Sequence, residues 1–252
     1  MNTKPEWNQD FSFAYYTKLM DILANNFTCR MICEAEELLE KKFAKPVLLL
    51  RHDLDVDPAR ALALAEIERS RGLRATYYVM LDNPLYTLEG ENLKIIEKLV
   101  SMGNHIGLHF TGNQLDERLV DEDCEKLEKI TGMEIRSVSF HRPKQEWLGG
   151  NLFVGNRICV YAKPLMQWYI SDSMGRFRAG EPVEAIKQMK GKILQFLTHP
   201  IWWQEKHASA VERITEWFNE KTRGWSVAEK RIFAHKVYEQ IPIMPDLSPE
   251  SD

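Results

Sequence analysis

Hydrophobic residues first recur at helical spacing along the chain and then gather into short apolar runs. The helical spacing predicts two helices, at Phe13–Asn26 and Cys33–Phe43. After Pro46, the four successive aliphatic residues at Val47–Leu50 are typical of a strand that is buried on both faces. The two helices therefore precede the first buried strand and form an N-terminal extension.

The segment after this strand has the residues that begin and end a helix. Asp57 is suited to cap the helix, Pro58 to occupy its first position and Gly72 to end it. The sequence that follows, ATYYVM at 75–80, is rich in residues that favour strands. This order starts an alternation of strands and helices.

The same alternation continues to the end of the chain. Further strands are expected at His105–Phe110, Ser137–His141, Ile158–Tyr161, Trp168–Ser171 and Ile193–Thr198. Further helices are expected at Leu93–Met102, Glu117–Ile130, Val183–Met189, Ser209–Glu220 and Val227–Gln240. About seven strands interleaved with helices predict an α/β fold with a parallel sheet, open or closed into a barrel.

The chain reads as a single domain. No linker rich in Pro, Gly or Ser divides it, and the sequence shows no internal repeat. Because α/β barrels often run to about 250 residues as one unit, the 252 residues fit one such domain. We expect a helical extension at 1–45, a barrel core at 46–203, and C-terminal helices with a polar tail at 204–252.

The charges are nearly balanced, since 33 Lys+Arg and 37 Asp+Glu give a formal net charge of -4. A dedicated nucleic-acid binder carries a basic patch or stripe, so we expect no nucleic acid among the partners. This argument does not extend to small anionic ligands.

The cysteines and the N-terminal residues indicate the cellular compartment of the protein. The four cysteines are too few and too scattered for a disulfide scaffold, and free thiols suit a reducing compartment. The first residues lack the apolar segment of a signal peptide, and no stretch of the sequence approaches 18 apolar residues. We therefore expect a cytoplasmic protein with no membrane span.

The first candidate site is RHDLDVDP, at the end of the Val47–Leu50 strand. Side chains alternate along a strand, so Asp53 and Asp55 project to one side and His52 to the other. Two close carboxylates repel unless a cation or a shared proton offsets the repulsion, and a divalent metal does so directly. Asp57 is better explained as the helix cap. Paired aspartates after a strand also occur in haloacid-dehalogenase-type phosphatases and in glycosyltransferases.

The second candidate site is GNHIGLHF. On an extended strand, His105 and His109 lie about 13 Å apart and cannot bind one ion together. His109 is the better candidate because it is nearer the carboxyl end of its strand, where α/β folds place their sites. We expect His105 to be a packing or supporting residue.

Three more strands end in polar residues: one in His141 and Arg142, one in Asp172 and one in His199. The carboxyl ends of parallel strands converge on one site in a barrel, so these side chains are candidates for the same site. A tryptophan pair, Trp202–Trp203, follows the last of them and is suited either to stack on a sugar ring or to pack in the barrel.

The order of these motifs resembles that of the polysaccharide deacetylase superfamily, carbohydrate esterase family four. The similar segments are RHDLDVDP with ATYYV, then GNHIGLH, HRP, SDS and LTH, and together they cover roughly Pro46 to Trp203. The resemblance implies a deformed (β/α) barrel with about seven strands. It also implies a reaction in which metal-bound water attacks an acetamide.

The resemblance also implies a role for each matched residue. Asp53 is the general base, and Asp55 and His109 are metal ligands. Arg142 holds Asp53, while His199 is the general acid and Asp172 tunes it. The sequence departs from the family pattern at Asn113, where a second histidine is usual, and at Phe177, where tryptophan is usual.

Asn is a poor ligand for an ion such as zinc, which leaves the third metal ligand open. His141 completes the coordination, or an extra water does, or the site is weak. A site with three protein ligands is the usual count for catalytic zinc, so we expect one divalent ion, zinc or a similar metal, held by Asp55, His109 and His141.

The expected function is therefore a metal-dependent deacetylase of an N-acetylated sugar or of an intermediate in glycan biosynthesis. A cytoplasmic protein would act on a nucleotide- or lipid-linked sugar in place of a cell-wall polymer. One alternative is a catalytically degenerate barrel that binds a glycan or a protein. The other is a phosphatase with Asp53 as nucleophile, which needs a further aspartate pair; the nearby acidic run at 121–123 lies in a helical pattern. The sequence does not indicate an oligomeric state.

Overall fold

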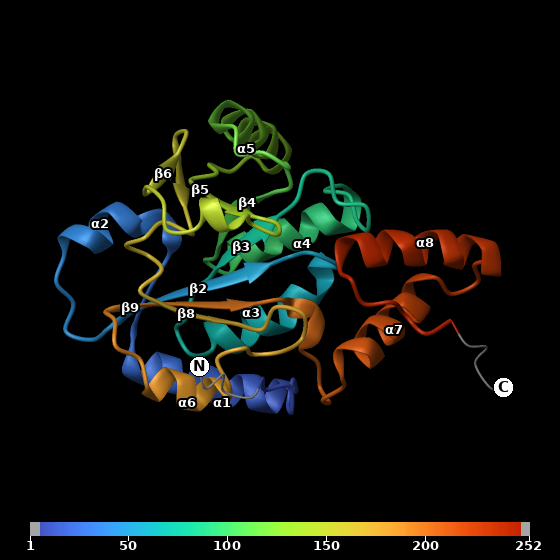
Figure 1. The fold of residues 1–252 in the computed structure, drawn as a ribbon, viewed down its shortest axis with the longest axis horizontal. Helices are drawn as coiled ribbons and strands as arrows, with labels where there is room; N and C mark the ends of the chain where they lie inside the picture. The colour runs from blue at the N-terminus through green and yellow to red at the C-terminus, as the bar shows by residue number, and fades with distance from the viewer. Residues whose placement is uncertain (1–5, 248–252) are drawn as a thin grey trace.

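The computed structural model describes residues 6–247, which form one nine-stranded sheet surrounded by helices (Figure 1). The strands are β1 (Thr28–Arg30), β2 (Val47–Asp53), β3 (Thr76–Val79), β4 (His105–Phe110), β5 (Ser137–Phe140), β6 (Phe153–Val154), β7 (Arg157–Cys159), β8 (Trp168–Ser171) and β9 (Ile193–Thr198). The helices are α1 (Phe13–Asn26), α2 (Ala35–Glu40), α3 (Ala61–Arg69), α4 (Gly90–Ser101), α5 (Glu117–Thr131), α6 (Pro182–Lys187), α7 (Ala210–Lys221) and α8 (Val227–Gln240).

The sheet follows the order β6-β7-β5-β4-β3-β2-β9-β8, with β1 as an additional neighbour of β2. Every pair is parallel except the β6–β7 hairpin. Helices α6, α1, α3, α4 and α5 contact one another in that order around the sheet. Within residues 6–247, the end strands β6 and β8 do not pair with each other, so the barrel is open. The expected α/β fold with a deformed (β/α) barrel is confirmed.

All seven expected strands are present, and two further short strands join them. In β1, residues 28–30 pair with the first half of β2, while β3 pairs with the second half at residues 51–53. Strand β6 is two residues long and turns into β7 through Gly155, whose φ is 57°. Both were missed because neither has the apolar run or the alternation that predicts a strand.

Several helices begin at capping residues of the sequence, whereas α2, α3, α4 and α6 have no side-chain cap. Asp57 accepts a hydrogen bond from the backbone N–H of Ala59 at 3.0 Å, which confirms its expected capping role. A 3₁₀ turn at Pro58–Arg60 precedes α3. Both C-terminal helices begin with a capping box, Ser209 with Glu212 and Ser226 with Glu229. These two helices pack beside the carboxyl ends of the strands (Figure 1).

One continuous hydrophobic core extends from the N-terminal extension to the C-terminal helices. It includes a buried carboxylate: Glu68 on α3 accepts hydrogen bonds from the hydroxyls of Tyr16 on α1 and Tyr77 on β3, and lies 2.9 Å from His52 Nε2. These contacts fix α1 and α3 against the face of β2 that carries His52. They therefore stabilise the strand whose opposite face carries Asp53.

The four cysteines are free thiols. Among residues 6–247, no helix combines the length and apolar character that crossing a bilayer requires.

Candidate metal centre

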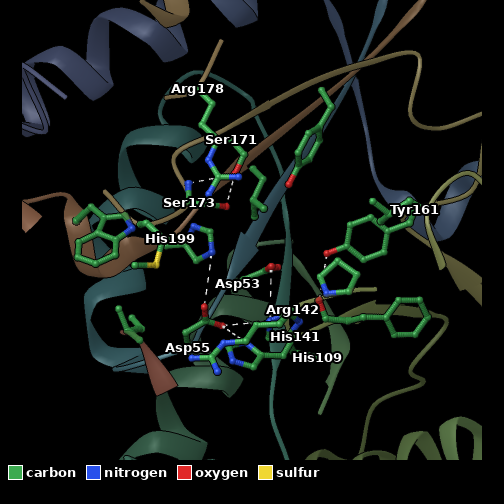
Figure 2. A pocket seen from close by; sticks show the side chains of 18 of the residues that line it. Asp53, Asp55, His109, His141, Arg142, Tyr161, Ser171, Ser173, Arg178 and His199 are labelled. Carbon is green, nitrogen blue, oxygen red and sulfur yellow. Dashed lines mark hydrogen bonds and ion pairs between the residues drawn. The ribbon is translucent and has the colours of Figure 1, made fainter. Parts of the chain in front are cut away.

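A cavity of about 540 Å³ opens at the carboxyl ends of the strands (Figure 2). Its walls include Asp53 from the end of β2, His109 from β4, His141 after β5, Ser171 from β8 and His199 after β9. Parallel strands bring these ends to one edge of the sheet, as sequence reasoning expected. The ends of five strands therefore meet at one cavity. Asp53, His109, His141 and His199 line it as expected, whereas the expected Asp172 is buried outside the cavity wall.

Asp53 is held by Arg51, its neighbour but one on β2. The Arg51 guanidinium donates from Nε to Oδ1 at 2.8 Å and from Nη2 to Oδ2 at 2.7 Å, and both residues are buried. Burial alone would raise the pKa of the Asp53 carboxyl, but the Arg51 charge lowers it below its ordinary value. Asp53 is therefore an anion inside the cavity wall.

Arg51 is itself fixed from several sides. Its guanidinium lies 5.3 Å from the ring centre of Tyr78 and 4.9 Å from that of Tyr161, and it donates to Gln195 Oε1 and to the Tyr161 hydroxyl. Aromatic faces attract a guanidinium and exclude water from it. The Arg51 and Asp53 side chains thus form one rigid unit.

The expected contact between Arg142 and Asp53 is wrong. Arg142 lines the cavity, but its Nη2 donates to the carbonyls of Glu239 and Gln240 at 2.6 and 2.9 Å. It follows β5 and has a φ of 53°, in the left-handed region, and ties this loop to the end of α8. The sequence contained the correct signal, since residues 51 and 53 of one strand project to the same side.

Asp55, His109 and His141 offer ligand atoms that all lie within 4.8 Å of one another. Oδ1 of Asp55 lies 3.1 Å from His109 Nε2 and 3.9 Å from His141 Nδ1. The far nitrogen of His109, Nδ1, contacts the hydroxyl of Ser139, which orients the ring. One carboxylate and two imidazoles form a donor set that suits zinc and similar divalent ions.

Two observations in the cavity fit a bound cation at this group. The buried Oδ1 of Asp55 lacks a well-aligned hydrogen-bond donor among the described residues, and a contact that it makes, at 3.1 Å, is with another candidate ligand atom, His109 Nε2. Burial lowers the pKa of His141 to about 4, so that its ring is neutral at pH 7 and keeps a lone pair for a metal. The residues present therefore fit a divalent ion.

Asn113 is exposed in the loop after β4 and is not part of the cavity wall. His141 stands beside Asp55 and His109 in its place, which is the arrangement that the first of the three open alternatives requires. His105 lies at the opposite end of β4, half-buried, and is also absent from the cavity wall.

Asp172 holds His199 on the side of Asp55 away from His109 and His141. The Nδ1 of His199 donates to Asp172 Oδ1 at 2.7 Å, and its Nε2 lies 3.6 Å from Asp55 Oδ2. The indole of Trp203 donates to the second oxygen of Asp172 at 2.8 Å. Burial would lower the pKa of His199, but the hydrogen bond and charge of Asp172 raise it to about 9. His199 is therefore a cation that faces the cavity at neutral pH.

The tryptophan pair divides its roles. Trp203 is fully buried and packs edge-on against Phe11 and Tyr16, so it serves the core. Trp202 is also buried but contributes to the cavity wall. Trp203 therefore packs in the core, and of the two residues Trp202 is the one placed to contact a ligand.

No protein-family model matches the sequence, and no curated protein does. Several solved structures are similar. Peptidoglycan deacetylase PdaC from Bacillus subtilis is 15% identical, with a TM-score of 0.44, over 79% of this chain and 98% of that chain. Wild-type BA3943 from Bacillus anthracis, a CE4 family pseudoenzyme, is 14% identical, with a TM-score of 0.42, over 74% and 65% of the two chains. A BA3943 mutant with restored enzymatic activity is 13% identical, with a TM-score of 0.44, over 71% and 63%.

The chain is similar to CE4 family structures. CE4 denotes carbohydrate esterase family four, the family whose motif order the sequence resembles. The similarity spans less than two thirds of the two BA3943 chains, at 63% and 65%, and nearly all of PdaC. At 13–15% identity and TM-scores below 0.5, this likeness carries nothing about chemistry, and the case for a function depends on the chain's own cavity.

Proposed function

We propose that this protein is a metal-dependent hydrolase that removes the acetyl group from an N-acetylated sugar. The observation that supports this most is the convergence of three kinds of group on one cavity: a candidate ligand set, an anion held by arginine and a histidine cation held by a carboxylate. Amide hydrolysis requires an activated water, charge stabilisation and a proton for the leaving amine. The cavity has one candidate for each.

The candidate ligand set is Asp55, His109 and His141. A divalent ion at this set would polarise the amide carbonyl and lower the pKa of a bound water to about 7. Zinc is the ion that we propose, because three N/O ligands and an open position are typical of catalytic zinc.

Asp53 is the proposed general base. Its carboxylate is kept deprotonated and fixed in direction by Arg51, and it lies 3.7 Å from His109 Nε2, beside the candidate ligands. A base in this position accepts the proton of the attacking water. General-base catalysis of this kind contributes about 10²–10⁴-fold to the rate.

His199 is the proposed general acid. With a pKa raised to about 9, it carries the proton at neutral pH that the departing amine needs. Asp172 sets this charge through the bond to Nδ1, which leaves Nε2 directed toward Asp55 and the cavity. Arg142 is proposed to shape the cavity by anchoring α8, and no longer to hold the base.

The phosphatase alternative loses support from the position of its second acidic pair. Asp121 and Asp123 lie on the outer helix α5, where they pair with Arg157 and Lys126, and neither is part of the cavity wall. We also propose a cytoplasmic location, a small-molecule or glycan substrate and no nucleic-acid partner.

The proposal is tested by metal content and acetate release. We expect the purified protein to bind about one zinc per chain and to release acetate from at least one member of a panel of N-acetylated sugars, free and nucleotide-linked. Asp53→Asn should keep the metal and lose acetate release. If zinc neither binds nor raises the melting temperature, the hydrolase proposal is wrong. If zinc binds and the panel is silent, while a glycan or protein binds equally to wild type and Asp53→Asn, the non-catalytic barrel is the better account.

A further inference from the structure

The end of the cavity away from the candidate metal ligands is lined by hydrogen-bond donors. Figure 2 shows Arg178, Ser171 and Ser173 together on the far side of His199 from Asp55. The two carboxylates in the cavity wall, Asp53 and Asp55, are both at the metal end. At the far end the wall presents the positive charge of Arg178, while the nearby carboxylate of Asp172 is buried outside the wall and bonded to His199.

Arg178 has no carboxylate partner within residues 6–247, although it is exposed to the cavity. Arg176, two residues earlier, pairs with Glu6 at 3.2 Å and is not part of the cavity wall. The backbone between them is fixed, because Phe177 is fully buried and exchanges two backbone hydrogen bonds with Trp7. Arg178 is thus an unpaired cation on an anchored loop.

Trp202 provides a second, independent indication. Its side chain is buried and part of the cavity wall, and its indole Nε1–H has no hydrogen-bond partner among the described residues. Buried N–H donors are almost always bonded, so this residue of the cavity wall has a donor without an acceptor. Beside Arg178, the hydroxyls of Ser171 and Ser173 are 2.7 Å apart and supply two further polar groups.

We infer that the substrate carries an anionic substituent, a phosphate, that Arg178 binds at the far end of the cavity while the acetamide lies at the metal end. A guanidinium binds a phosphate with two parallel hydrogen bonds, and a cavity of about 540 Å³ is of the size that takes small molecules. The position given to the acetamide depends on the proposed function, whereas the phosphate site does not. A sugar monophosphate and a nucleoside-diphosphate sugar share this chemistry.

The phosphate site can be tested with ligands that cannot be deacetylated. We would measure by calorimetry the binding of glucose, glucose 6-phosphate, glucose 1-phosphate and UDP-glucose to the zinc-loaded protein and to the protein dialysed against a chelator. At least one phosphorylated sugar should bind about 10-fold more tightly than glucose, with or without zinc. Monophosphates and UDP-glucose separate the two sources of the phosphate.

Arg178→Gln should weaken that binding about 10-fold, and Arg178→Lys should weaken it less. The matched control is Arg176→Gln, which removes a neighbouring guanidinium outside the cavity and should leave binding unchanged. Each variant should melt near the wild-type temperature because both side chains are exposed or half-exposed. The inference is overturned if Arg178→Gln binds phosphorylated sugars as tightly as wild type does. It is also overturned if the wild-type protein no longer binds them once zinc is removed, because the phosphate is then not held by Arg178.

Acetate release separates this inference from the proposed function. Turnover of N-acetylglucosamine with no preference for its phosphorylated forms would overturn the phosphate site and leave the deacetylase proposal intact. Phosphate binding that depends on Arg178, without acetate release from any N-acetylated sugar, would support the site and count against the deacetylase.

Discussion

Arg51 and Asp53, two residues apart on one strand, form a two-point ion pair in the wall of the cavity, with N–O distances of 2.8 and 2.7 Å. Both side chains lie on the same face of β2, so the pair forms within a single rigid element. The base of the proposed reaction is therefore oriented by its own strand, and the loop that carries Arg142 is left to anchor α8.

The first prediction concerns the stability of this pair. Arg51→Met leaves the buried Asp53 without its cation, and we expect the free energy of unfolding to fall by about 3 kcal/mol or more. Adding Asp53→Asn should recover part of the loss, because neither charge of the pair then remains. Urea denaturation of the two single variants and the double variant measures this coupling. Arg142→Met, the control, should show no coupling to Asp53→Asn. Coupling as large as that of Arg51→Met would mean that Arg142 holds Asp53.

The second prediction concerns the third metal ligand. His141→Ala should weaken zinc binding by about 10-fold or more, since the imidazole lies among the candidate ligand atoms. Asn113→Ala should change zinc affinity little, because that side chain is exposed outside the cavity. Competition with a chromogenic chelator gives both affinities. A loss for Asn113→Ala alone would show that the third ligand is misplaced.

The third prediction separates the base from the metal site. In Asp53→Asn, we expect zinc to stay bound, while kcat for acetate release falls by about 10²-fold or more. His199→Ala should act similarly, because the leaving amine then lacks its proton donor. Zinc content and kcat are measured on the same preparations. Loss of zinc together with activity in Asp53→Asn would instead make Asp53 a ligand.

The fourth prediction concerns pH. In chelator-treated protein, the pKa of His199 should stand near 9, above its ordinary 6.5, because Asp172 favours the charged ring. A raised pKa in the folded state means that the interaction stabilises fully below about pH 6.5 and is lost as pH rises through about 9. Asp172→Asn should lower the pKa of His199, as ring-proton NMR would show.

The same change should appear in stability. The difference in unfolding free energy between wild type and Asp172→Asn should be largest below pH 6.5 and should shrink above pH 9. A difference that stays constant across this range would mean that the hydrogen bonds of Asp172 to the backbone N–H of His199 and to Trp203 account for its effect.

Much of the fold could be read from the sequence, because burial imposes patterns on neighbouring residues. The aliphatic run at Val47–Leu50 and the cap at Asp57 each depend on local chemistry, and both appear where expected. The strand β1 was missed, since its three half-buried residues carry no such pattern and exist as a strand only because β2 lies beside them.

The sequence by itself determined part of the cavity wall, since strand ends and alternation place Asp53, Asp55, His109 and His199 there, but it did not indicate Arg178. It did not determine their partners. That Arg51 rather than Arg142 binds Asp53 was decided by the tertiary structure, which turns the Arg142 loop toward α8 and encloses Arg51 between two tyrosine rings from other strands and loops. Local spacing fixes the direction of a side chain, whereas its partner depends on which distant segments the packed sheet brings within hydrogen-bond reach.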